Sequence, residues 1–308
     1  MSTREKLRLG TRGSELARTQ SGTIAAALER LGFAVELTII KTSGDQNTTS
    51  AFASIGPQGV FVREIEQALV ERRVELAVHS FKDLPTKSPA ELTIGAVPAR
   101  VDPADLLLVR RDALAGAADD WLPLKAGARV GTASARRRAW LKDFRSDLAV
   151  EPLRGNVPTR VRRLEEGKFD AIVLAAAGVE RLQAEQRLGS SLADVAVLRL
   201  DPARFVSAPA QGALAVQCRR DDARVLAALA QLDHAPTRAA VTAERDALAR
   251  AEGGCDVAFG AYCFAADGKH TLVAMLERAG AVHVARVENA DPATLGAAAW
   301  AKLDAALS

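Results

Sequence analysis

The alternation of short apolar segments with longer amphipathic ones constrains this chain more than any other feature of its sequence. The pattern predicts strands near 7–9, 34–40, 76–78 and 92–97, a helix that begins at Ser14 and another over 61–73. Strands that alternate with helices are typical of α/β domains with parallel sheets. We therefore expect the amino-terminal third of the chain to form such a domain.

A second alternating series follows a punctuated stretch around Pro98 and Pro103. Strands are expected near 106–109, 129–131, 149–152 and 171–174, with helices between them up to about residue 204. Residues 207–218 then alternate as a strand does, which predicts that Cys218 lies on a core-facing side. These segments predict a second α/β domain, followed by a further strand.

The last part of the chain has a different pattern. It predicts a helix over 236–250, strands near 262–265, 271–277 and 282–287, and a final helix over 292–306. The pairs Asp267-Gly268 and Ala279-Gly280 are expected to join these strands as hairpin turns. Because 308 residues exceed what one hydrophobic core usually holds, we expect two or three domains, the last a small α+β domain with an antiparallel sheet.

The composition excludes several classes of protein. The chain is 48% hydrophobic and 26% charged, has no low-complexity tract, and has no apolar run of the length that a membrane span or signal peptide needs. We therefore expect a cytoplasmic protein. Three cysteines without CxxC spacing favour neither a disulfide framework nor a structural zinc site, so any special cysteine is expected to be a reactive thiol.

Cys255 has the most unusual context of the three cysteines. It follows Gly253 and Gly254 between a predicted helix and a predicted strand, which indicates an adaptable loop with close backbone access. From this context alone, a reactive thiol and a small buried side chain are equally good interpretations. Cys263, inside a predicted strand, is expected to be a core residue.

Asp83 lies in the segment AVHSFKDLP, at the predicted carboxyl end of a short buried strand. Ligand crevices in open α/β sheets form at that edge. A carboxylate beside Lys82 and close to His79 is suited to proton transfer. The alternative is that Asp83 caps a turn before Pro85, and spacing alone slightly favours this alternative.

Basic residues gather where helices are expected to begin. The net charge is only +3, yet residues 129–163 contain ten lysines and arginines against three acids. The arginines near predicted helix starts are Arg12, Arg136, Arg137, Arg138, Arg154 and Arg160. Because a helix N-terminus is already positive, this placement predicts a multiply carboxylated or polyanionic ligand, with a solvated helical surface as the alternative. On that surface, Arg162 can pair with Glu166.

Seven stretches of the sequence together resemble the porphobilinogen deaminase family, also called hydroxymethylbilane synthases. In chain order they are LRLGTRGSELA, AVHSFKDLP, VGTASARRR, LRGNVPTR, DAIVLAAAGVERL, APAQGALAVQCR and RAEGGCDVAFG. The resemblance implies two α/β domains related to periplasmic binding proteins, which flank a cleft, and a third domain that carries a cofactor on a cysteine. It places the domains at 1–101 with 207–230, at 102–206 and at 231–308.

The resemblance also implies a reaction. Cys255 would hold a dipyrromethane cofactor through a thioether, four porphobilinogen units would be added with loss of ammonia, and water would release linear hydroxymethylbilane. Asp83 matches the family's catalytic carboxylate, which assists proton transfer and stabilises positive charge on pyrrole nitrogen. Cofactor binding is implied for Cys255, Lys82, Ser134, Arg136, Arg137, Arg154 and Asn156. Substrate binding is implied for Arg12, Ser14, Arg160, Arg181 and Gln211.

The resemblance implies no metal, nucleic acid or membrane partner, and we expect a monomer. The polar stretch 41–59 is long enough to form a lid. Ser54 and Gln58 stand there where many bacterial relatives carry lysines, which predicts altered substrate affinity or altered lid kinetics. Two other functions stay open on the residues alone. A non-catalytic anion-binding module explains the arginines but not the Gly-Gly-Cys loop, and nucleic-acid binding by residues 129–163 lacks a recognisable motif.

Overall fold

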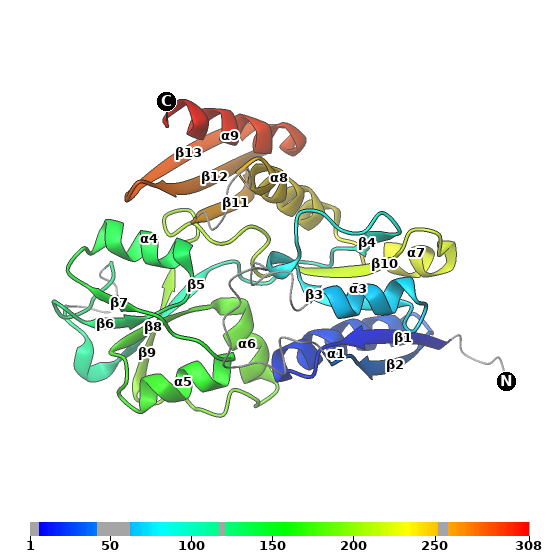
Figure 1. Ribbon diagram of the computed structural model, residues 1–308, viewed down its shortest axis with the longest axis horizontal. Helices are drawn as coiled ribbons and strands as arrows, with labels where there is room; N and C mark the ends of the chain where they lie inside the picture. The colour runs from blue at the N-terminus through cyan, green and yellow to red at the C-terminus, as the bar shows by residue number, and fades with distance from the viewer. Residues whose placement is uncertain (1–5, 42–61, 117–120, 252–257, 308) are drawn as a thin grey trace. The chain divides into compact units, whose positions relative to one another are not determined.

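The computed structural model describes residues 6–41, 62–116, 121–251 and 258–307. The chain divides into two compact units, of which the first consists of Met1–Val101 and Ala213–Arg238, and the second of Asp102–Gly212 and Ala239–Ser308. Each unit contains a five-stranded sheet flanked by helices, and the second also contains a sheet of three strands (Figure 1). The expected α/β class is confirmed.

The sheet of the first unit has the strand order β2-β1-β3-β10-β4. Its strands are β1 (Lys6–Thr11), β2 (Ala34–Ile39), β3 (Leu76–Ser80), β4 (Leu92–Ala96) and β10 (Leu214–Arg219). β1 pairs in parallel with β2 and β3, but β10 pairs antiparallel with β3 and β4. The sequence predicted a strand at 207–218 without a direction, and this strand makes the sheet mixed. This strand returns from a distant part of the sequence, so no short strand–helix–strand crossover forces it to be parallel.

Helices cover both faces of this sheet. They are α1 (Glu15–Arg30), α3 (Arg63–Val70) and α7 (Ala223–Ala230). α1 and α7 pack on the face that carries Leu76, Val216 and Cys218, whereas α3 packs beside Ala77 on the opposite face. Cys218 is fully buried, which confirms its predicted place in the core.

The larger sheet of the second unit has the order β7-β6-β8-β5-β9. Its strands are β5 (Asp105–Arg110), β6 (Arg129–Gly131), β7 (Ala149–Glu151), β8 (Ala171–Ala175) and β9 (Val195–Leu200). β6 is parallel to β7 and β8, but β5 is antiparallel to β8 and β9, so this sheet is also mixed. β9 was not among the strands expected from the sequence, although its sequence, VAVLRL, is largely apolar.

Three helices follow the parallel strands of this sheet. They are α4 (Ala135–Phe144) after β6, α5 (Val157–Glu165) after β7 and α6 (Ala176–Ala184) after β8; the short turn η2 (Arg111–Ala113) follows β5. The core of the larger sheet contains Trp140 and Leu141 of α4 together with Val273 and Met275 from the three-stranded sheet. α4 therefore shares one core with both sheets of the second unit.

The three-stranded sheet is antiparallel, as expected. It consists of β11 (Phe259–Ala266), β12 (Lys269–Arg278) and β13 (Ala281–Asn289), and it packs against α8 (Ala235–Ala251) and α9 (Leu295–Ala305), which the turn η3 (Pro292–Thr294) precedes. Both hairpin turns have positive φ at their two central residues: Asp267 51°, Gly268 74°, Ala279 53° and Gly280 84°. This is the two-residue turn that suits the twist of antiparallel strands, so the predicted turns are confirmed. Cys263 is buried, as expected.

The division into three domains stays a proposal. Residues of β11, β12, α8 and α9 form a core of their own, although β12 also contributes to the core around α4. None of the helices in the described ranges has the length and apolar character that crossing a membrane requires.

Glu244 of α8 is a fully buried carboxylate that joins three segments of the second unit. One carboxylate oxygen accepts a hydrogen bond from the backbone N–H of Ala210 (2.6 Å), and the other accepts from that of Cys263 (2.8 Å). Hydrogen bonds to a buried charged group are among the stronger ones in proteins. Glu244 therefore attaches α8 both to the loop before β10 and to β11.

Glu244→Gln should destabilise the protein by about 1–3 kcal/mol, because the amide group keeps only one acceptor oxygen and leaves a buried N–H without a partner. Urea unfolding measures the loss. Asp246→Asn on the same helix is the matched control, since Asp246 forms an exposed pair with Arg250 and its loss should cost little. Equal losses in the two variants would contradict this role of Glu244.

Candidate active site

The first unit collects four expected site residues at one edge of its sheet. Arg12 and Ser14 follow β1, and Ser14 is the N-cap of α1, as predicted. Lys82 and Asp83 follow β3, within the short turn η1 (Phe81–Asp83). Because β1 and β3 are parallel, their carboxyl ends lie at the same edge. Lys82 is half-buried and Asp83 is exposed, so this carboxylate is open to a ligand.

The second unit collects its expected site residues at the carboxyl ends of β6, β7 and β8. Ser134 caps α4 by accepting a hydrogen bond from the N–H of Arg137 (3.4 Å), and Asn156 caps α5 by accepting from the N–H of Thr159 (2.9 Å). Neither helix has an acidic residue in its first turn. The positive helix ends are therefore not neutralised by local acids, as the sequence predicted.

A buried ionic centre lies at this edge, around Asp105. Arg137 donates two hydrogen bonds to Oδ1 of Asp105 (2.6 and 3.1 Å), and Arg136 donates a third to Oδ2 (2.8 Å). Each guanidinium also donates to a backbone carbonyl, that of Val206 for Arg136 and that of Val173 for Arg137. The carboxylate is fully buried and the two arginines nearly so, which leaves one uncompensated positive charge in the group.

The pKa values of this centre follow from burial and from the charges. Burial alone would raise the pKa of Asp105, but the charges of Arg136 and Arg137, with their hydrogen bonds, hold it well below its usual range. Burial lowers the pKa of Arg136, and the charge of Asp105 opposes that fall. Asp105 is therefore the buried counter-ion that the two guanidiniums share.

Arg160 and Arg181 add further positive charge to the second unit. Burial, together with the charge of Arg137, lowers the pKa of Arg160 to about 10. Burial also lowers the pKa of Arg181 to about 10, although Glu180 opposes this. Arg160 donates a hydrogen bond to the backbone carbonyl of Gly155, and Arg181 donates one to that of Gly212; both acceptors are neutral. An anion beside Arg160 or Arg181 would restore the lowered pKa.

Gln211 belongs to the same centre, but its amide nitrogen faces protein acceptors. It donates to the backbone carbonyls of Pro103 and Ala104 (2.8 and 3.1 Å) and to Asp105 (3.0 Å). Arg154 is exposed just before α5. Five of the expected site residues thus lie within or close to one edge of the sheet: Ser134, Arg136, Arg137, Arg160 and Arg181. Gln211 lies there too, but it contributes through its contact with Asp105.

Sequence reasoning missed Asp105. Its signal was an acid at the first position of an otherwise apolar strand, Asp105–Arg110, where a charged side chain needs a partner. Cys255 lies outside the described residues, as do Ser54 and Gln58 of the expected lid.

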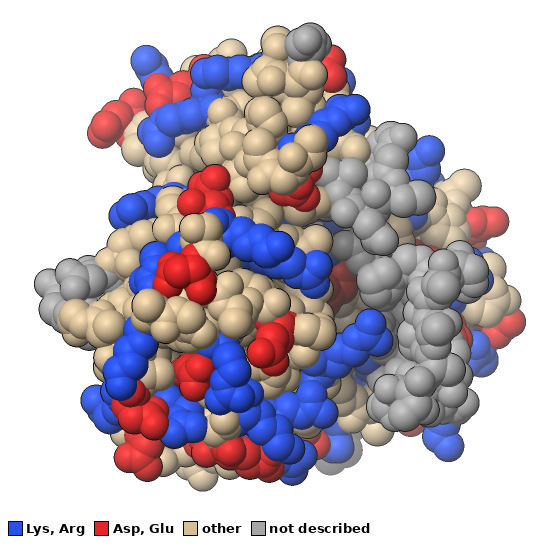
Figure 2. Space-filling view, turned by 60° about the vertical axis from the view of Figure 1, so that its left-hand side comes forward, with Lys and Arg blue, Asp and Glu red and all other residues tan. Residues whose placement is uncertain are grey.

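The basic stretch 129–163 also contains ordinary surface pairs. Arg162 pairs with Glu166 as predicted, and Arg129 and Arg145 pair with Asp170 and Asp147. On the face that Figure 2 shows, lysine and arginine side chains are interspersed with acidic ones. These three pairs fit a solvated surface, and the buried Arg136 and Arg137 are the exceptional arginines of the stretch.

Cations at helix starts, along the carboxyl ends of strands in α/β units, define a class of proteins that handle an anionic ligand. The family model described as "Porphobilinogen deaminase, dipyromethane cofactor binding domain" matches residues 7–227. This chain belongs to the porphobilinogen deaminase family.

Relatives named porphobilinogen deaminase support this assignment. The chain is 46% identical to one from Syntrophobacter fumaroxidans, over 88% of this chain and 84% of the relative. It is 43% identical to one from Desulforudis audaxviator, over 94% of this chain and 90% of the relative.

A solved structure of the periplasmic aliphatic sulphonate binding protein SsuA from Escherichia coli is 17% identical, over 81% of this chain and 71% of that one, with a TM-score of 0.41.

Asp105→Asn should cost about 3–5 kcal/mol of stability at neutral pH, because it leaves two buried guanidiniums without a counter-ion. The folded pKa of Asp105 is depressed, so its contribution is present above the unfolded value of about 3.9 and is lost as pH falls below it. The unfolding free energies of wild type and variant, measured by urea titration at several pH values, should therefore begin to converge below about pH 4 and approach each other further as the pH falls towards the depressed folded pKa. A constant difference across that range would contradict the ionic role.

Proposed function

We propose that this protein is a hydroxymethylbilane synthase, a transferase that condenses four porphobilinogen molecules onto a dipyrromethane primer and releases the linear tetrapyrrole. The observation that carries the proposal is the surplus of buried positive charge around Asp105, in a member of the porphobilinogen deaminase family. Acetate and propionate groups of pyrroles are the anions that this surplus suits. We also propose that the enzyme acts as a monomer in the cytoplasm, with neither nucleic acid nor membrane as partner.

The donor set fits a dipyrromethane cofactor. Arg136 and Arg137 carry two positive charges against the single charge of Asp105, and both lie at a helix start without acidic neighbours in its first turn. Guanidinium groups bind carboxylates with defined geometry. We assign cofactor binding to Lys82, Ser134, Arg136, Arg137, Arg154 and Asn156, and the covalent attachment to Cys255. When bound, the cofactor supplies the pyrrole carbon to which the first substrate unit is joined.

The remaining site residues bind substrate in this proposal. They are Arg12, Ser14, Arg160, Arg181 and Gln211. Because burial has lowered the pKa of Arg160 and of Arg181, a substrate carboxylate beside either one would stabilise the charged guanidinium. Gln211 acts mainly by fixing Asp105, since its amide nitrogen already donates to that carboxylate.

Asp83 is the proposed catalytic residue. Porphobilinogen must lose ammonia to react, and this leaves positive charge on the pyrrole. An exposed carboxylate on a turn at the strand end can hold the proton of the leaving amine and stabilise that charge. Lys82, its neighbour, is assigned to a carboxylate of the cofactor.

A non-catalytic anion-binding protein is the competing function, and intact mass decides between the two. The wild type should carry a mass corresponding to a dipyrromethane, and further pyrrole units should appear after brief exposure to porphobilinogen. Cys255→Ser should show its bare sequence mass under both conditions, because the thioether cannot form. Cys263→Ser, which changes a buried strand residue, is the matched control and should keep the adduct. Wild type at its bare mass, unable to gain pyrrole units, would refute the proposal.

Asp83→Asn should slow turnover by about 10²–10⁴-fold, the usual contribution of general acid–base catalysis, while the adduct mass and the unfolding midpoint stay unchanged. Porphobilinogen consumption, assayed alongside intact mass, gives both quantities. Asp112→Asn, an exposed acid whose partner is Arg110, is the control for loss of a carboxylate. Near-normal turnover in Asp83→Asn would refute the assigned role.

A further inference from the structure

Three buried polar side chains lie on the α3 face of the first sheet and take no part in the proposed chemistry. They are Glu66 of α3, His79 of β3 and Gln217 of β10, and they are 9%, 7% and 0% exposed. The neighbouring core on this face is apolar, with Ile65, Leu69 and Ala77 among its members. Polar groups buried in such a core destabilise the fold unless they bond to one another.

The strand register brings these side chains together. Gln217 is paired with Ala77, and His79, two residues later in β3, is paired with Ala215, two residues earlier in β10. Gln217 and His79 are therefore diagonal neighbours on one face, within reach of long side chains. The Nε2 atom of Gln217 donates to Oε1 of Glu66 (2.9 Å), which reaches down from α3.

The remaining polar contacts of the group extend to the chain on both sides of Asp83. Nε2 of Gln217 also lies 3.4 Å from Oγ of Ser88, and Ser88 hydrogen-bonds Glu66 as well. Burial lowers the pKa of His79 to about 4, while a hydrogen bond with Gln217 opposes this. His79 is therefore neutral at neutral pH, and its ring lies beside the Gln217 side chain.

His79 precedes the turn η1, and Ser88 follows it. The segment between them contains Lys82 and Asp83, and Asp83 itself is exposed. Both ends of this segment thus lie next to the same glutamine: Ser88 through a hydrogen bond and His79 as its diagonal neighbour on the sheet, while Glu66 accepts a hydrogen bond from the same amide nitrogen. Polar groups joined and packed in this way favour one arrangement of the chain that carries them.

We propose that Gln217, oriented by Glu66, is a positioning residue that holds the segment between His79 and Ser88 and thereby places the Asp83 carboxylate for proton transfer. This inference rests on the proposed function, because it assigns the reaction to Asp83. Its physical basis is that a small displacement of a catalytic group lowers the rate far more than it lowers stability.

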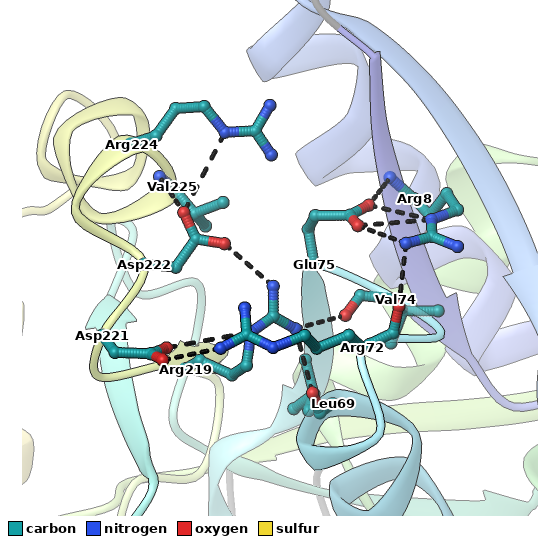
Figure 3. A network of polar contacts seen from close by, with 10 residues as sticks. All are labelled: Arg8, Leu69, Arg72, Val74, Glu75, Arg219, Asp221, Asp222, Arg224 and Val225. Atoms are coloured by element: carbon teal, nitrogen blue, oxygen red, sulfur yellow. Dashed lines mark hydrogen bonds and ion pairs between the residues drawn. The ribbon is translucent and has the colours of Figure 1, made fainter.

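A second polar network in the same unit provides a matched control. At the opposite ends of β3 and β10, Arg8 binds Glu75, and Arg219 donates to Asp222 (2.8 Å) and to the backbone carbonyls of Leu69 and Val74 (Figure 3). Losing part of this network should reduce stability without moving the turn that carries Asp83. Asp222→Asn is therefore a structural control.

The test compares Gln217→Met, which keeps the size of the side chain but removes its hydrogen bonds, with Asp222→Asn. Turnover by the cofactor-loaded Gln217→Met enzyme should fall by about 10- to 100-fold, with KM little changed. Hydrogen exchange of the amides in residues 79–88 should become faster in this variant and stay unchanged in Asp222→Asn. Glu66→Gln gives the same comparison with less disturbance of packing, so a poorly folding Gln217→Met does not prevent a decision.

Gln217→Glu is the conservative variant that separates positioning from packing. Burial already raises the pKa of Glu66, so two adjacent carboxyl groups would share one proton and restore the hydrogen bond. This variant should recover most of the turnover and the slow exchange. Turnover and exchange in Gln217→Met and Glu66→Gln no different from Asp222→Asn would overturn the proposal. If the wild type forms no pyrrole adduct, the proposed function fails, but the exchange data still decide whether Gln217 holds this segment.

Discussion

The ion pairs of Asp105 with Arg136 and Arg137 are the interaction on which the second unit depends. A guanidinium that is taken wholly out of water needs an adjacent anion, and this unit places two of them beside one carboxylate. The same carboxylate binds Gln211, which holds the loop before β10, while Glu244 binds the backbone of that loop at Ala210. Asp105 therefore both neutralises part of the charge at the start of α4 and helps, together with Glu244, to hold the loop before β10 in place.

The polar groups at the corresponding edge of the first unit's sheet have a different requirement. Its proposed catalytic carboxylate is exposed, so no buried counter-ion is needed to keep it charged. What such a group needs is a defined position, and the buried polar side chains of Glu66, Gln217 and His79 lie next to the chain segment that carries it. Both units therefore place polar groups at the carboxyl ends of parallel strands, one to hold charge and the other to hold a turn.

Local features were predictable because they depend on neighbours in the sequence. The N-cap at Ser14, the two hairpin turns and the burial of Cys218 follow from side-chain type and spacing over a few residues. The direction of β10 was not predictable in this way. β10 joins a sheet whose other strands come from much earlier in the chain, so no short crossover sets its direction. β9, in contrast, has a largely apolar sequence, VAVLRL, and could have been predicted from it.

The sequence by itself determined the α/β class, the helix starts at which arginines gather, and the motifs that indicate the family. These are properties of residue order, and they need no knowledge of distant contacts. Only the tertiary structure decided which of those arginines are buried. Their counter-ion, Asp105, lies 31 residues before Arg136 and 32 residues before Arg137 in the sequence. The tertiary structure also decided that Gln217 meets Glu66, 151 residues earlier, since only the pairing of β10 with β3 brings them to one face.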